Sequence, residues 1–163
     1  MRYLIATVGA VVVTFAVIVV VYVVGFRTKN ATILRGVRGV NRVLFNPQQM
    51  KSAGTAGAYA SIVRHRGRTT GTRYETPIVV REYGDDLVTV LPYGTQADWI
   101  KNVLAAGEAQ IVSEGREWNV DQPRLVDTDD LPDLMTAKDD RMNGFIGITD
   151  AVRFRRQLIG SSS

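Results

Sequence analysis

The chain begins with an apolar run long enough to cross a lipid bilayer. Tyr3 to Phe26 spans 24 residues without a charged side chain. As a helix rising about 1.5 Å per residue it reaches roughly 36 Å, which exceeds the hydrocarbon thickness of a typical membrane. Because lipid offers no hydrogen-bond partners, the backbone must satisfy its own groups as a helix. A cleaved signal peptide fits less well, since the run is long and no A-x-A-like site follows. We therefore predict a transmembrane anchor over residues 1–27.

The charges that flank this run predict its orientation. Only Arg2 and the amino terminus precede it, whereas five cations follow closely: Arg27, Lys29, Arg35, Arg38 and Arg42. The positive-inside rule places the more basic flank in the cytoplasm. We expect a single-pass protein of the inner (cytoplasmic) membrane, with its remaining residues in the cytoplasm and the lipid bilayer as one of its partners.

Residues 28–57 are predicted to form a basic amphipathic juxtamembrane helix and a linker. The apolar residues of the helix share one face: Ile33, Val37, Val40 and Leu44. This pattern fits a helix lying among lipid headgroups and equally one that packs on a globular domain. Asn46–Pro47 is expected to end the helix, because the residue before a proline avoids the helical conformation. Gly54–Gly57 is then expected to be a flexible join.

Charge and composition narrow the possible chemistry. All 16 acidic residues follow Tyr74, so the net charge of +4 hides a strong separation of acidic from purely basic regions along the chain. A bilayer explains the acid-free first part better than a nucleic acid does, and we expect no nucleic-acid partner. The chain has no cysteine and one histidine, His65. Disulfides, thiolate chemistry and iron–sulfur clusters are therefore excluded, and no metal site is expected. A bound organic cofactor, carboxylate chemistry or no catalysis remains.

Residues 58–163 are predicted to form a cofactor-binding domain, mainly β with peripheral helices. Short β-branched segments bounded by turns indicate a small antiparallel barrel or sandwich. The expected strands are 60–66, 76–82, 86–91, 109–113 and 117–120, and 124–126 is a candidate extension of the last. One helix is expected at Ala97–Ala106, because its apolar residues share one side and Gly107 is expected to end it. A short helix at most is expected within Asp127–Lys138. The apolar pattern of Phe145–Leu158 fits either a strand or a helix.

The segment His65–Arg73 (HRGRTTGTR) is the most distinctive local motif. Two glycines let the backbone approach a ligand, while threonine hydroxyls, arginines and turn amides supply donors to an anion. The motif therefore fits a phosphate site, and equally a solvated basic hairpin. It is not a Walker loop, since GxxxxGK[ST] is absent. His65 itself is expected to be a partly buried strand residue rather than a catalytic base.

Several motifs in order resemble one family. They are GRTTG between two strands with Glu75-Thr76-Pro77, then YG…ADWIKNVLAAG, then SEGREWNV…PRLV. Over Asn41–Val126 the chain resembles the deazaflavin-dependent nitroreductase family of actinobacteria, within the flavin/deazaflavin oxidoreductases. The resemblance implies a split β-barrel of the FMN-binding/PNP-oxidase-like type that binds coenzyme F-420 (8-hydroxy-5-deazaflavin) and uses its reduced form as a hydride donor. It also implies a possible homodimer.

The resemblance carries cofactor contacts to individual positions. The phosphate and acidic tail are expected at the turn residues Gly67, Arg68, Thr69 and Thr70. The deazaflavin ring is expected over the strand residues Thr76, Pro77, Ile78 and Val79. The ring and the ribityl chain are expected beside Tyr93, Gly94, Asp98, Trp99 and Asn102. No catalytic residue is certain, and Tyr59 and Tyr93 are candidate proton donors.

This chain departs from the best-known nitroreductase at three of these places. That enzyme has a lysine where Thr69 stands, a Ser-Lys pair where Pro92–Tyr93 stands and a tyrosine where Val79 stands. Nitroimidazole reduction is therefore not predicted. Three other arginines are the candidates to compensate for the lost basic contacts: Arg64, Arg66 and Arg73.

The anchor and the resemblance together predict a membrane-anchored oxidoreductase. We expect hydride transfer to a small, lipophilic, quinone-like substrate, because the site would lie near the membrane surface. Two alternatives remain open. The barrel could hold FMN or haem instead, or it could be a membrane-tethered binding module without its own catalysis.

Overall fold

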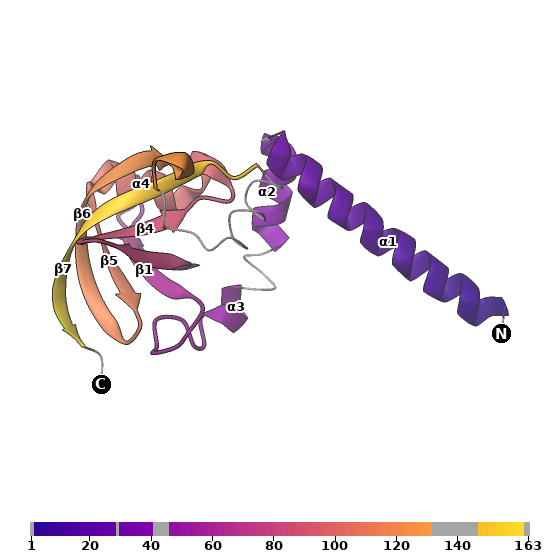
Figure 1. The fold of residues 1–163 in the computed structure, drawn as a ribbon, viewed down its shortest axis with the longest axis horizontal. Coiled ribbons are helices and arrows are strands. Elements are labelled where there is room, and N and C mark those ends of the chain that lie inside the picture. The colour runs from indigo at the N-terminus through magenta and orange to yellow at the C-terminus, as the bar shows by residue number, and fades with distance from the viewer. Residues whose placement is uncertain (1, 29, 41–45, 132–146, 162–163) are drawn as a thin grey trace.

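The computed structural model describes residues 2–28, 30–40, 46–131 and 147–161. Three helices come first: α1 (Arg2–Arg27), α2 (Ala31–Val40) and the short α3 (Asn46–Gln49). Figure 1 shows α1 projecting away from the rest of the molecule, with α2 between α1 and the barrel. By length and composition α1 is able to cross a membrane, and 6% of its apolar window Ala10–Arg27 is buried inside the protein.

The remaining elements build one antiparallel sheet. Its seven strands are β1 (Ser61–Arg66), β2 (Arg73–Ile78), β3 (Val80–Tyr83), β4 (Asp86–Val90), β5 (Glu108–Ser113), β6 (Arg116–Asp127) and β7 (Asp150–Ser161). The helix α4 (Asp98–Ala106) and the single turns η2 (Gly94–Gln96) and η3 (Thr128–Asp130) lie between strands. The predicted mainly-β class with peripheral helices is confirmed.

The strand order makes the sheet an open barrel. The order is β2-β1-β5-β6-β7-β4-β3, so β2 and β3 are the two edge strands. Only Val79 separates the end of β2 from the start of β3. Because consecutive strands form opposite edges, the sheet has to curl until its edges meet at Val79. The result is a half-barrel that is closed at this corner and open between the diverging edges.

The core lies inside the curl, beneath α4. Ile100 and Val103 of α4 are fully buried against residues of the surrounding strands such as Val63, Ile111 and Phe154. Their spacing is that of one helical face. Gly107 ends α4 in the left-handed conformation (φ 75°) and donates its N–H to the Val103 carbonyl, as predicted for a glycine stop. The core therefore fixes α4 over β1, next to the turn that follows this strand.

The structure corrects or resolves four predictions about individual strands and helices. Residues 76–82 are not one strand, because the chain leaves the β1 edge and joins β4 at the Val79 corner. Residues 124–126 do continue the preceding strand within β6, past a register shift. The ambiguous Phe145–Leu158 segment contributes the strand β7 from Asp150 onward. Within Asp127–Lys138 the structure describes η3, while residues 132–138 lie outside the described part.

The segment before the barrel also differs from expectation. Asn46 begins α3 instead of ending a helix, with Pro47 in its first turn, where a missing N–H costs nothing. Gly54–Gly57 is not a flexible join, since Gly54 is buried and bonded to the Ala60 carbonyl at 2.7 Å. On α2, Leu34 and Val37 are buried, so this helix does pack on the protein. Leu44 lies outside the described residues.

Candidate functional site

The turn between β1 and β2 is held by its own backbone. The Gly67 N–H donates to the Thr72 carbonyl and the Gly71 N–H to the Gly67 carbonyl, both at 2.8 Å. Gly71 has φ +67°, a conformation that side chains disfavour. A Cβ at Gly67 would lie 2.9 Å from the Thr70 hydroxyl oxygen. The turn itself therefore favours glycine at position 71, whatever it binds, whereas a Cβ at position 67 would force the side chains of Thr70 or Tyr74 to shift.

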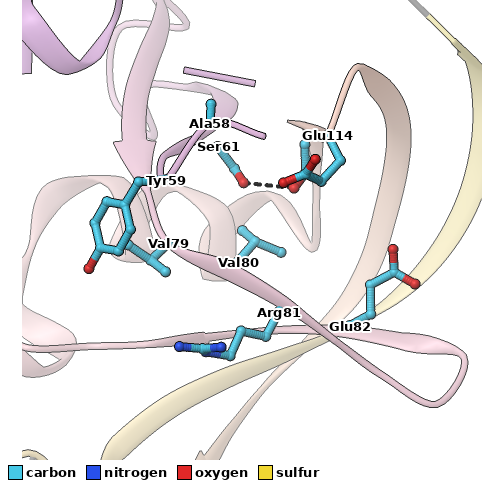
Figure 2. Close-up of a pocket in the computed structure, with 9 residues that line it drawn as sticks. Ala58, Tyr59, Ser61, Val79, Val80, Arg81, Glu82 and Glu114 are labelled. Atoms are coloured by element: carbon cyan, nitrogen blue, oxygen red, sulfur yellow. Dashed lines mark hydrogen bonds between the residues drawn. The ribbon is translucent and has the colours of Figure 1, made fainter. Parts of the chain in front are cut away.

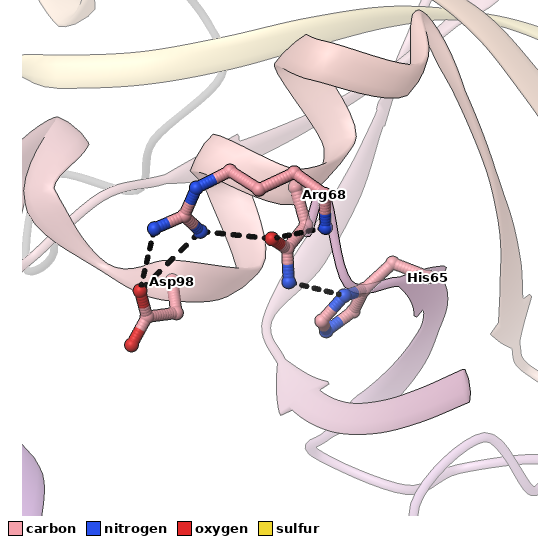
Figure 3. Close-up of polar contacts among 4 residues, drawn as sticks. His65, Arg68 and Asp98 are labelled. Carbon is pink, nitrogen blue, oxygen red and sulfur yellow. Dashed lines mark hydrogen bonds and ion pairs between the residues drawn. The ribbon is translucent and has the colours of Figure 1, made fainter. Parts of the chain in front are cut away.

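Arg68 attaches this turn to α4 (Figure 3). Its backbone N–H and its Nη1 both donate to Asn102 Oδ1, at 3.2 and 2.8 Å. Its guanidinium also lies 3.3–3.4 Å from Asp98 Oδ1 in the first turn of α4. The Asp98 side chain is 84% exposed and that of Arg68 39%. Such a solvated ion pair contributes at most about 1 kcal/mol, so an incoming anion can replace Asp98 at low cost.

His65 contacts the amide nitrogen of Asn102, whose amide oxygen contacts Arg68. Its side chain is buried, as predicted, and its Nδ1 and Nε2 lie 3.2 Å from Asn102 Nδ2 and from Thr76 Oγ1. The ring also stacks on Tyr74, with centroids 5.7 Å apart. Burial lowers the pKa of His65 below its ordinary value. His65 is therefore a neutral structural residue at physiological pH.

Two further arginines meet at the mouth of the turn. Arg66 and Arg73 are paired directly across β1 and β2, and both are exposed. Neither forms an ion pair with another described residue. Like charges directly opposite each other on a sheet are destabilising. Arg64, by contrast, is engaged by Glu75 and Glu117 at 2.9 Å, and these contacts raise its pKa. Of the three expected compensating cations, two remain available.

The predicted ring-binding strand is β2, an edge of the open sheet. The Ile78 side chain belongs to the core and Thr76 contacts His65, so neither presents its side chain fully to a ligand. Pro77 and Val79 are half-buried. Because β2 pairs with β1 alone, its outer backbone edge has no strand partner within the described sheet.

A groove of about 400 Å³ opens at the Val79 corner (Figure 2). Val79 and Tyr59 line it together with Val80, Arg81 and Ser61, whose hydroxyl contacts Ser113 at 2.8 Å. Tyr59 is 79% exposed. The candidate donor Tyr59 and the ring-contact position Val79 therefore share one hollow, on the loop before β1 and on the corner after β2.

A second cavity, of about 270 Å³, lies where α1 and α2 meet the barrel. Its walls include Phe26 from α1, Leu34 and Arg38 from α2, and Tyr93 and Gly94 before α4. The rings of Phe26 and Tyr93 are 5.7 Å apart. Arg38 Nη1 is buried and has no hydrogen-bond partner among the described residues. Among the described residues, the cavity thus combines apolar walls with the charged side chains of Arg38 and Asp150.

The structure divides the predicted site residues among three places. Gly67–Thr70 meets Asp98 and Asn102 at the turn, Val79 meets Tyr59 in the groove, and Tyr93 and Gly94 face the second cavity. Trp99 packs half-buried on the core. The segment from Tyr93 to Asp98 links the second cavity to the turn. Sequence reasoning missed Phe26, Leu34 and Arg38 as site residues, because no local pattern reveals that the two helices fold back on Tyr93.

Comparisons with known proteins give structural neighbours but no sequence match. No protein-family model and no curated protein matches this chain. Solved structures that resemble it include a domain-swapped dimer (TM-score 0.47, 11% identity, 59% of this chain and 79% of the other). Others are an F-420 reductase (0.41, 14%, 61% and 86%) and the F-420-H2-dependent reductase FDR-A (0.44, 10%, 59% and 93%).

Proposed function

We propose that this protein is a membrane-anchored oxidoreductase that binds coenzyme F-420 and passes a hydride to a small, lipophilic, quinone-like acceptor. The observation that carries the proposal is the turn at Gly67–Thr72. Arg68 lies on it, and it is flanked by two facing arginines that form no ion pair with another described residue. An anion that bridges Arg66 and Arg73 would relieve their repulsion. The family resemblance of the same motif supports a phosphate-bearing, acidic cofactor.

The residues present fit such a cofactor in two respects. Arg66, Arg68 and Arg73, with the turn amides at Thr69 and Thr70, would hold the phosphate and the acidic tail. The free edge of β2 would receive the ring near Pro77 and Val79, where the barrel is open. Reduced F-420, when bound, supplies a hydride, that is, two electrons and one proton. The protein supplies position and a site with restricted water.

The second cavity would take up a lipophilic acceptor from the bilayer before the acceptor reaches the ring near Val79. Phe26, Leu34 and Tyr93 give the cavity apolar walls beside the end of α1, and Arg38 Nη1 provides a donor to an acceptor oxygen. A quinone that accepts a hydride needs one further proton to become a quinol, and the coenzyme is oxidised. Of the two candidate proton donors, Tyr59 shares the groove with Val79 and would supply that proton, whereas Tyr93 lies in the second cavity. Membrane anchoring by α1 would deliver such a substrate from the bilayer.

The test uses the full chain in phospholipid nanodiscs. F-420 and, separately, FMN are titrated while the emission of Trp99 and Trp118 is followed. We expect saturable quenching by F-420 that is lost in Arg68→Ala and retained in Arg124→Ala, an exposed arginine of β6. Oxidation of reduced F-420 by menadione in the same nanodiscs then tests turnover.

Each alternative predicts a different outcome of this test. Binding of FMN alone would identify another cofactor for the same barrel. Binding of F-420 without turnover of any acceptor would indicate a tethered binding module. Turnover of soluble acceptors without turnover of quinones would remove the lipophilic substrate from the proposal. A chain that binds neither cofactor would overturn the oxidoreductase assignment.

A further inference from the structure

The positions of the hydrogen atoms can be assigned in the network of Arg68, Asn102 and His65, because some of its nitrogen atoms can only donate. Asn102 Oδ1 lies 3.2 Å from the Arg68 backbone nitrogen and 2.8 Å from Arg68 Nη1. Both of these atoms are donors only, so the amide oxygen must face them. The Asn102 NH2 group is thereby directed at His65 Nδ1, 3.2 Å away.

This orientation selects one form of the imidazole. Because the Asn102 NH2 group donates, His65 Nδ1 has to accept with its lone pair. The ring proton is then on Nε2, which donates to Thr76 Oγ1 at 3.2 Å. The neutral Nε2–H tautomer is thus the form that satisfies all of these contacts.

A second proton on the ring would break the chain of contacts. With a hydrogen on Nδ1, His65 and Asn102 present donors to each other. Rotation of the Asn102 amide relieves this conflict, but it turns the NH2 group toward the Arg68 backbone N–H and guanidinium. Separation of His65 from Asn102 instead removes the contact that fixes the orientation of the amide. Rotation breaks both bonds between Arg68 and Asn102, and separation leaves them without support from His65.

We propose that His65 is a positioning residue for the turn Gly67–Thr72: in its neutral form it orients Asn102, which holds Arg68, and its protonation releases the turn from α4. The positioning itself does not depend on the identity of the ligand. Its consequence for the cofactor rests on the proposed function, since Arg68 is a proposed contact of the acidic part of F-420. Acidification would then weaken cofactor binding.

The groups around the imidazole fit this role. Tyr74 and Thr76 approach it from β2 and Asn102 from α4. The charged groups of this network, Arg68 and Asp98, lie on the far side of Asn102. On β5, the residues paired with the neighbouring positions of β1 are Val112, Ile111 and Gln110, none of which is ionisable. Burial lowers the pKa of His65, so the release falls on the acid side of its ordinary value of 6.5.

The experiment follows two atoms of the full chain in nanodiscs by NMR, without ligand. His65 is the sole histidine of the sequence, so its ring signals report its titration directly. Hydrogen exchange of the Arg68 amide reports the bond to Asn102. The matched control is the Gly71 amide, which bonds within the turn to the Gly67 carbonyl. Relative to Gly71, we expect Arg68 protection to fall about tenfold as His65 is protonated.

The variant Asn102→Asp separates this role from mere packing. A carboxylate accepts from Arg68 with one oxygen and from a protonated His65 Nδ1 with the other, so Arg68 should stay protected at all pH values tested. A nearby negative charge should also raise the pKa of His65. His65→Gln, which does not titrate, should make Arg68 protection independent of pH even if its level changes.

Two results would overturn the inference. One is constant Arg68 protection while His65 titrates, and the other is an unchanged pH response in Asn102→Asp. F-420 affinity is measured in parallel. If Arg68 follows His65 but F-420 binds at no pH, the positioning role is supported and the proposed function fails. If F-420 binding weakens in step with Arg68 protection, both are supported.

Discussion

Phe26, the penultimate residue of α1, lies against Tyr93 of the barrel with ring centroids 5.7 Å apart and planes inclined by 32°. This contact joins the candidate membrane anchor directly to the segment that leads into α4. Gly25 lets α1 and α2 approach closely next to this contact, because a Cβ at position 25 would clash with the Ile33 side chain of α2. The end of α1 is therefore one wall of the second cavity.

We predict that Phe26→Ala weakens the use of lipophilic acceptors while leaving F-420 binding intact. Aromatic pairs of this kind contribute about 0.5–1.5 kcal/mol beyond their buried area, so we expect KM for menadione to rise roughly tenfold. Steady-state kinetics in nanodiscs measure this. The matched control is Phe15→Ala, an exposed phenylalanine of the same helix, which should behave like the wild type. Equal effects of both variants would count against a cavity at the junction.

Arg38 is predicted to bind the oxygen of the acceptor. Its Nη1 is buried beside the cavity and has no partner among the described residues. Replacing it with methionine removes the donor but keeps much of the stem, and a bond to a charged donor is worth about 1.5–3 kcal/mol. We expect kcat/KM for quinones to fall by roughly tenfold or more. The exposed Arg35 of the same helix serves as the control, and Arg35→Met should leave kcat/KM unchanged.

The turn glycine Gly71 is predicted to matter for stability. Gly71 has φ +67°, where an L-residue costs about 1 kcal/mol, so Gly71→Ala should destabilise the barrel by about that amount. Gly36→Ala is the control, because Gly36 lies in α2 with open space around it and alanine favours helices. Thermal unfolding followed by tryptophan emission compares the two. A Gly71→Ala protein as stable as the wild type would contradict the turn geometry.

Stability is predicted to fall in two stages on acidification. The pKa of His65 is lowered in the folded state by burial, so the unfolded chain takes up the proton first as the pH drops below about 6.5. Stability therefore decreases from there down to the folded pKa and then levels off. The pKa of Glu82 is lowered by its hydrogen bond to Arg156, which adds a second loss below about 4.5. Unfolding in urea across this range should show both stages, and His65→Gln should lack the first.

Local signals predicted most of the fold. The apolar run gave α1, and α4 followed from its helical spacing and the Gly107 stop. The corner at Val79 was missed because the side chains on both sides of it are β-branched and apolar, and only the pairing of β2 with β1 and of β3 with β4 separates them. The strand β7 stayed ambiguous because it is defined by pairing and not by its own apolar pattern. One partner, β4, is distant in the sequence, and the pairing with the other, β6, contains register shifts.

The candidate site was predictable only in part. The motif His65–Arg73 was visible, but the role of Asn102 required the contact across 34 positions to Arg68. Arg38 was interpreted only as one of several cations that follow the apolar run, since nothing in α2 distinguishes it from Arg35. The two differ only because α2 turns one arginine toward Tyr93 and leaves the other exposed. Long-range packing, which no local pattern encodes, decides which of these cations lines a site.

The facing arginines give the most direct test of the anion site. Arg66 and Arg73 repel each other across β1 and β2 in the free protein, so Arg73→Glu should replace repulsion with attraction and raise the melting temperature. If the pair binds an acidic cofactor, the same change should lower F-420 affinity by about tenfold or more, because one favourable charged contact is lost and a repulsive one is gained. We therefore expect Arg73→Glu to raise the melting temperature and to lower F-420 affinity. If Arg73 had no part in the cofactor site, the substitution would raise the melting temperature without lowering the affinity. The variant Arg124→Glu, on exposed β6, controls for net charge and should leave F-420 affinity unchanged. An Arg73→Glu protein that binds F-420 as tightly as the wild type would exclude this pair from the cofactor site.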